Sequence, residues 1–83
     1  MPLFMDVHQT LPEGAGADDV AAAHQADLEI QGKYKVNYIN YWVDVTGGKV
    51  FCLVDAPDAD AAAACHKEAH GLLADEIYPV IQG

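Results

Sequence analysis

The chain has 83 residues and a net charge of −9 at neutral pH, and its only basic side chains besides histidine are four lysines. So few cations cannot neutralise the phosphates of a nucleic acid or of an anionic membrane, which excludes both as partners, whereas an acidic surface attracts divalent cations. Hydrophobic residues make up 52% of the chain, a share that predicts one folded domain over residues 1–83 rather than a disordered segment.

Two further features of the sequence bear on where the protein works. It has no run of about 18 apolar residues and no basic stretch followed by an apolar one, so we expect neither a membrane span nor a signal peptide. The two cysteines, Cys52 and Cys65, form no C-x-x-C motif. We therefore expect reduced, buried thiols and a cytoplasmic protein.

The first strand and helix are predicted from periodicity. Residues 2–8 have the period-two pattern of a half-buried strand, which places Asp6 and His8 on one face. After a loop rich in proline and glycine, a helix is expected over residues 17–31, with acidic side chains in its first turn and Gly32 as its stop.

A hairpin is predicted in the middle of the chain. Residues 34–45 are rich in tyrosine, isoleucine, valine and tryptophan, which is typical of a long strand. Strict alternation would place Tyr38 and Trp42 on one face and Tyr41 on the other. A pair of glycines then indicates a tight turn into an antiparallel strand over residues 50–55.

The last helix and strand follow a proline. Pro57 ends the preceding strand, and Asp58 or Asp60 can cap or charge the start of an alanine-rich helix. The apolar face of this helix is expected to carry Ala62, Cys65, Ala69, Leu72 and Leu73. Residues 76–82 predict a final strand, which Pro79 restricts to the edge of a sheet.

The order of these elements, β-α-β-β-α-β, predicts a ferredoxin-like α+β fold, with one antiparallel sheet and two helices on one of its faces. Nothing in the chain remains to cover the other face of the sheet. An uncovered, partly apolar sheet face in a chain of this size favours a homodimer packed sheet to sheet, of the dimeric α+β barrel type.

A pair of histidines on the second helix is the first candidate for metal binding. His66, Glu68 and His70 form the pattern H-x-E-x-H, which differs from the zinc-protease motif H-E-x-x-H because Lys67 follows the first histidine. Histidines four apart project from one side of a helix and can share a borderline cation such as nickel, zinc or copper. The competing interpretation is a solvated role near the helix end, where cations are favoured.

The apolar face of the first helix carries three polar residues, His24, Asp27 and Gln31. They could form a satisfied internal network, with Asp27 accepting from a tyrosine hydroxyl or from Trp42. They could instead line a polar pocket between the helix and the sheet. Asp6 and His8, two apart on one strand face, offer a further two-ligand site, or a solvated strand end.

Four blocks of the sequence resemble a family of small bacterial proteins of formerly unknown function, with a nickel-binding member. They are MPLFMDVH, AAAHQADLEIQGKYKV, NYINYWVD, and FCLVDAPD followed by CHKEAHGL. The resemblance covers nearly the whole chain and implies a ferredoxin-like homodimer that binds nickel at its surface, for sequestration or detoxification rather than catalysis. The family block H-x-x-D-x-x-x-Q falls on His24, Asp27 and Gln31, and H-x-x-A-H-G begins at His66.

Two hypotheses follow, besides the possibility that the chain is only an interaction module whose polar residues are structural. In the first, a non-catalytic homodimer binds nickel, with zinc and copper as competitors, through histidines and carboxylates. The candidate ligands are His66, His70, His24, Asp27, His8, Asp6 and Glu68. In the second, the protein is a small-molecule enzyme or binder whose pocket is lined by His24, Asp27, Gln31, Tyr41 and Trp42, with His24 as general base. Nucleophilic catalysis has little support, since the chain contains no serine and both cysteines are expected in the core.

Overall fold

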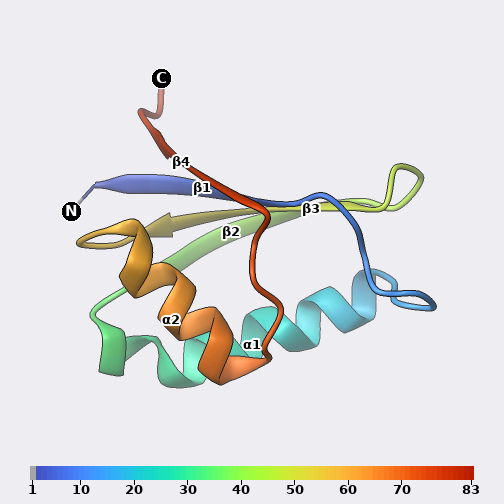
Figure 1. Ribbon diagram of the computed structural model, residues 1–83, viewed down its shortest axis with the longest axis horizontal. Helices are drawn as coiled ribbons and strands as arrows, with labels where there is room; N and C mark the ends of the chain where they lie inside the picture. The colour runs from blue at the N-terminus through green and yellow to red at the C-terminus, as the bar shows by residue number, and fades with distance from the viewer. Residues whose placement is uncertain (1) are drawn as a thin grey trace.

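The computed structural model describes residues 2–83, which form a four-stranded sheet and two helices (Figure 1). The elements are β1 (Leu3–His8), α1 (Ala17–Tyr34), β2 (Asn37–Asp44), β3 (Lys49–Asp55), α2 (Ala59–Ala69) and β4 (Glu76–Val80). The strands are ordered β2-β3-β1-β4, and all neighbours are antiparallel. Each strand–helix–strand unit therefore joins two parallel strands with a third between them, which confirms the predicted ferredoxin-like fold.

Both helices lie on one side of the sheet, and the core fills the space between the two layers (Figure 1). Its buried residues are Val20, Val36, Tyr38, Val50, Cys52, Val54, Ala56, Ala62 and Cys65. Both cysteines are free and buried, as predicted. β4 is an edge strand, as Pro79 indicated. Within residues 2–83, neither helix combines the length and apolarity that a membrane crossing requires.

Helix α1 continues for one turn beyond its predicted end. Gly32 lies inside the helix, and Lys35 instead takes the left-handed conformation that ends it, with φ of 58°. A glycine costs a helix only about 1 kcal/mol, and Ile30 and Tyr34 pack against the core on either side of it. The packing of the last turn therefore overrides the glycine, and the prediction of a stop at Gly32 is wrong.

Helix α2 is shorter than predicted. Asp58 caps its start by accepting a hydrogen bond from the Ala61 amide at 2.8 Å. The helix ends at Ala69, and Gly71 reverses the chain with φ of 75°, while its amide donates to the His66 carbonyl. Leu72 and Leu73, predicted on the apolar face of the helix, lie in the connection to β4 and are 43% and 52% exposed.

A β-bulge breaks the predicted alternation of β2. Tyr38 pairs with Val54, but the register shifts between Tyr38 and Asn40, so that Tyr41 pairs with Cys52. Directly paired residues point to the same side of a sheet, and Val54 and Cys52 both belong to the core. Tyr38 and Tyr41 therefore both face the helices, contrary to the strict alternation, which cannot detect an extra residue.

The other face of the sheet is open and apolar. Met5 pairs with Leu53 and Val7 with Phe51, and all four point away from the helices. The bulge places Trp42 on this face too, where it pairs with Phe51 and is 49% exposed. No element of residues 2–83 covers this surface (Figure 1).

Candidate metal centre

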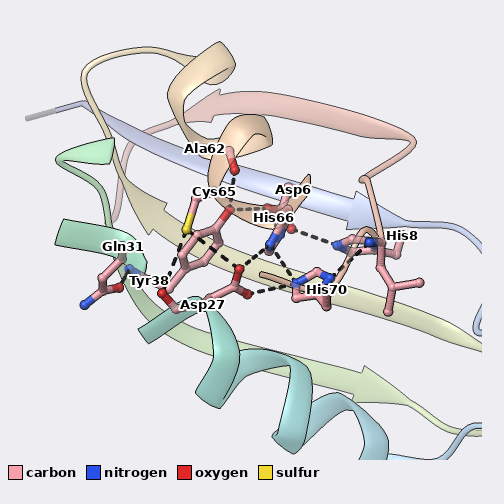
Figure 2. Close-up of polar contacts among 10 residues, drawn as sticks. Asp6, His8, Asp27, Gln31, Tyr38, Ala62, Cys65, His66 and His70 are labelled. Atoms are coloured by element: carbon pink, nitrogen blue, oxygen red, sulfur yellow. Dashed lines mark hydrogen bonds and ion pairs between the residues drawn. The ribbon is translucent and has the colours of Figure 1, made fainter. Parts of the chain in front are cut away.

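Three elements bring histidines and aspartates together between the sheet and the helices (Figure 2). Asp6 and His8 share one face of β1 because they are two apart on a strand, and this face points toward the helices because their pairing partners Cys52 and Val50 belong to the core. Asp27 comes from the buried side of α1. His66 and His70, one turn apart, come from the last turn and the C-cap of α2. The centre therefore draws on local periodicity within three elements and on the packing of all of them.

His66 is the middle of the cluster. Its Nδ1 lies 2.9 Å from Asp27 Oδ1 and its Nε2 2.8 Å from Asp6 Oδ2, and the ring is 2% exposed. Carboxylates only accept hydrogen bonds, so both ring nitrogens donate and the ring is an imidazolium. Burial lowers the pKa of His66, but the hydrogen bonds to Asp27 and Asp6 outweigh it and raise the pKa to about 9.

The pKa values of the two carboxylates beside His66 are lowered. Burial raises the pKa of Asp6, yet its contacts with His66 and His8 outweigh the burial and lower the pKa to about 2. The pKa of Asp27 is also below its usual value, because the hydrogen bonds from His66 and His70 outweigh the burial. At neutral pH the carboxylates of Asp6 and Asp27 are thus ionised on either side of the imidazolium of His66.

His70 is held in one tautomer. Its Nδ1 accepts a hydrogen bond from the Leu72 amide at 3.0 Å, so the proton of the neutral ring is on Nε2. That nitrogen lies 3.1 Å from Asp27 Oδ2 and 3.1 Å from His66 Nδ1. The loop after α2 therefore aims the second histidine of the pair at the same carboxylate that the first one contacts.

Tyr38 and Cys65 support the cluster, and sequence reasoning missed both. The Tyr38 ring stacks on His66 with centroids 4.6 Å apart, and its hydroxyl donates to the Ala62 carbonyl at 3.0 Å. The Cys65 thiol lies 3.8 Å from Asp27 Oδ1. Only an unspecified tyrosine hydroxyl was predicted, as a donor to Asp27, and the contact between the Tyr38 ring and His66 depends on how α2 packs on the sheet.

Two overlapping groups of side chains have the spacing of a metal site. The first is Asp6, His8, Cys52 and His66, and the second is Asp27, His66 and His70, with the candidate ligand atoms of each group within 4.8 Å of one another. Imidazole and carboxylate donors suit nickel, copper and zinc. Burial and the nearby Asp6 raise the pKa of the Cys52 thiol far above its usual value, so it stays protonated and is a poor ligand.

One buried oxygen in the first group lacks a hydrogen bond. Asp6 Oδ1 is fully buried and accepts no hydrogen bond. His8 Nε2 lies 3.4 Å from it, and a protonated His8 would interact with this oxygen through its charge alone. A buried carboxylate oxygen without a partner is costly, and a cation is one means of satisfying it. The donor chemistry of both groups therefore fits a divalent metal, and the second group consists wholly of competent ligands.

A cavity of about 390 Å³ opens beside the second group. Asp27, His66 and His70 form part of its lining, together with His24 and Tyr41. The His24 ring lies 4.8 Å from that of Tyr41, and burial lowers its pKa more than the nearby Asp27 raises it. His24 is therefore a neutral imidazole in the cavity wall, outside both groups.

The remaining predicted residues lie elsewhere. Glu68 points away from the cluster and accepts hydrogen bonds from Lys33 at 2.7 Å and the Tyr34 hydroxyl at 2.6 Å. Gln31 accepts from the Tyr38 amide at 2.9 Å and does not line the cavity. Trp42, expected in the pocket, faces the open side of the sheet. The structure thus unites His66, His70 and Asp27, places Asp6 and His8 beside them, and separates Glu68 from them.

The similarity to known proteins covers the elements that carry the cluster. Residues 4–80 match the family described as nickel responsive protein SCO4226-like. The fold is similar to the crystal structure of SCO4226 from Streptomyces coelicolor A3(2), with a TM-score of 0.88 and 37% sequence identity over 98% of each chain. The comparison with curated proteins finds no match. The similarity spans the sheet and both helices, and thus every element that contributes to the cluster.

Proposed function

Because the chain belongs to the family of nickel responsive SCO4226-like proteins, we propose that it binds nickel(II) through Asp27, His66 and His70 and holds the ion without catalysing a reaction. The observation that carries the proposal is the convergence of these side chains, in which His70 Nε2 and Asp27 Oδ1 both lie within about 3 Å of His66 Nδ1. Two imidazoles and a carboxylate form a donor set that nickel accepts.

The role of holding an ion, as opposed to transforming a substrate, is supported by the charges around the centre. The chain carries a net charge of −9, which concentrates divalent cations near the protein. Both thiols are buried, and their pKa values are raised, for Cys65 to about 12, so neither is an active nucleophile. Sequestration of the metal, in the cytoplasm, is the function that we propose.

Nickel uptake is expected to depend on pH because His66 holds a proton at the nitrogen that would bind the ion. In the metal-free protein its pKa is about 9, so a nickel ion at Nδ1 must displace a proton at neutral pH. The apparent affinity should therefore rise about tenfold for each pH unit, up to about pH 9. Calorimetric titration with nickel in two buffers of different ionisation enthalpy measures both the affinity and the released proton.

The outcome that contradicts this proposal is equally specific. Heat no greater than that of nickel added to a generic acidic protein, at every pH, would refute specific binding. Zinc and copper are titrated in parallel, since both accept the same donors and copper usually binds more tightly. Saturation by one of them with no saturable nickel binding would retain the site and reject nickel as its ion.

The cavity favours a second candidate function, binding or conversion of a small molecule. Its volume of about 390 Å³ falls within the range of ligand pockets. His24 lines it as a neutral imidazole, which is the protonation state a general base requires. The pocket predicted from Gln31 and Trp42 is not formed, so this candidate rests on His24, Asp27 and Tyr41 alone.

We also propose that two copies of the chain associate through the open face of the sheet. The apolar side chains on this face include Met5, Trp42, Leu53 and Val80, which line one pocket. Exposed apolar surface of this kind, on a small domain, is stabilised by burial against a second copy.

Trp42→Lys is expected to convert the dimer to a monomer, because a buried lysine without a partner opposes association within an apolar interface. Sedimentation or light scattering measures the mass. The matched control is Leu28→Lys, which adds the same charge on α1, on a partly exposed residue away from the sheet. A wild-type mass of one chain, or an unchanged dimer in Trp42→Lys, would contradict the proposed interface.

A further inference from the structure

The cavity beside the metal group is much larger than an ion requires. A water molecule occupies about 30 Å³ of liquid, so a space of about 390 Å³ would hold many waters beside a single ion. The protein supplies three ligand atoms from Asp27, His66 and His70. They leave coordination positions open on an ion that takes about four to six ligands. Whatever occupies the cavity is therefore within reach of the ion.

Part of the cavity wall is apolar. Leu11, Val20, Leu72 and Leu73 line it, and the two last are among the most exposed large apolar side chains of the molecule. Water molecules beside this part of the wall would face side chains that offer no hydrogen-bond partner, which is unfavourable. An apolar molecule in the same place would instead bury leucine surface.

The charges of the cavity further restrict its occupant. Three carboxyl groups line the space, those of Asp19, Asp27 and Asp75. A negatively charged ligand would be repelled by these carboxylates, whereas a neutral one adds no charge to be compensated. Nitrogen donors on a neutral ring system meet this condition and are ligands that nickel prefers.

We infer that the cavity admits a second ligand of the bound metal, a neutral, apolar-bodied chelator with nitrogen donors, so that the protein takes up nickel as a chelate. This inference rests on the proposed function, because the ion links the protein to the chelator. Asp27, His66 and His70 hold the metal, and the leucines and Tyr41 contact the body of the chelator. The Leu72 amide also donates a hydrogen bond to His70. The segment that carries the leucines of the cavity wall is therefore in direct contact with a metal ligand.

The test compares nickel(II) alone with its one-to-one complex with 2,2′-bipyridine, each titrated into the full-length protein by calorimetry. A chelated ion has fewer open positions, so without the cavity it should bind no more tightly than the free ion. We expect it to bind at least about tenfold more tightly, equivalent to about 1.4 kcal/mol. The complex with pyridine-2-carboxylate, an anionic chelator, should lack this preference.

Filling the cavity provides the matched variants. Ala23→Leu places a larger side chain in the lining of the cavity, while Ala22→Leu makes the same change at the exposed neighbouring position. Neither residue is a candidate ligand. Ala23→Leu should lose the preference for the bipyridine complex and bind free nickel as the wild type does, whereas Ala22→Leu should behave as the wild type toward both.

The outcomes separate the inference from the proposed function. Saturable binding of free nickel without a preference for the bipyridine complex overturns the inference alone. A preference that survives in Ala23→Leu, or bipyridine that binds equally well without nickel, also overturns it. Absence of saturable binding for both the free ion and the complex overturns the proposed function and this inference together.

Discussion

His66→Ala is expected to destabilise the metal-free protein by about 3–5 kcal/mol, since removal of one partner from a buried ionic network leaves uncompensated charge in the interior. In this case the loss affects two carboxylates, Asp6 and Asp27, each of which accepts a hydrogen bond from the ring. The substitution also removes the ring on which Tyr38 stacks. The free energy of unfolding, obtained from urea denaturation with a chelator present, measures the effect.

The pH of this measurement follows from the direction of the pKa shifts. The pKa of His66 is raised from 6.5 to about 9, so its contribution is complete below 6.5 and is lost as the pH rises through 9. The pKa of Asp6 is lowered from 3.8 to about 2, so its contribution is complete above 3.8 and is lost as the pH falls through 2. Both contributions are therefore complete at about pH 5.

The matched control is His24→Ala, which removes an imidazole that has no hydrogen-bond partner among residues 2–83 and whose ring lies tilted against that of Tyr41. Its expected cost is about 1 kcal/mol or less. Asp6→Asn combined with His66→Ala removes the charge of the carboxylate that loses its close hydrogen bond from His66 Nε2, and it should recover part of the lost stability. Equal effects of His66→Ala and His24→Ala would refute the role of His66 as the centre of an ionic network.

His70→Ala is expected to lower the affinity for nickel by more than about a hundredfold while the fold is retained. Loss of an outer-shell partner typically costs 10–100-fold in metal affinity, and loss of a direct ligand costs more. Asp27 keeps its hydrogen bond from His66 in this variant, so no buried charge loses its last partner. His70 therefore separates metal binding from stability, which His66 cannot do. Calorimetric titration with nickel measures the affinity, and circular dichroism confirms that the variant is folded.

Three variants identify alternative ligand sets in the same titration. Glu68→Gln should bind nickel as the wild type does, because Glu68 contacts Lys33 and Tyr34 outside the cluster. His24→Ala should also retain binding, and its failure to do so would extend the site into the cavity wall. The proposed site would be contradicted if His8→Ala lost nickel binding while His70→Ala kept it. That result would place the ion in the group around Asp6.

The structural role of His66 changes how its histidine pair is interpreted. In a sequence, two histidines four apart on a helix appear equivalent as ligands. In the fold, His66 is buried and doubly hydrogen-bonded, while His70 is partly open to the cavity and bound through one nitrogen to the loop amide of Leu72. In the metal-free protein, the ring nitrogens that would bind nickel both carry a proton. His66 Nδ1 must release its proton to the solvent, whereas the neutral ring of His70 must move its proton from Nε2 to Nδ1, in place of the hydrogen bond from the Leu72 amide.

Several features of this protein were determined by the sequence itself. The type and order of the six elements follow from periods of two and 3.6 residues, and these predicted the fold. The same periods place Asp6 beside His8 and His66 beside His70, because each pair lies within one element. The acidic composition, with no arginine, likewise favoured a metal ion as a partner over a nucleic acid.

The meeting of these pairs was decided only by the tertiary structure. His66 contacts Asp6 and Asp27, which are 60 and 39 residues away along the chain, and the three elements that carry them could pack at many rotations. Successive helical residues differ by about 100°, so the packing of α2 decides that His66 points inward and Glu68 outward. The bulge in β2 that places Tyr41 as well as Tyr38 on the helix side of the sheet, and the leucines displaced from α2 to the lining of the cavity, arise from the same long-range packing, to which local periodicity is insensitive.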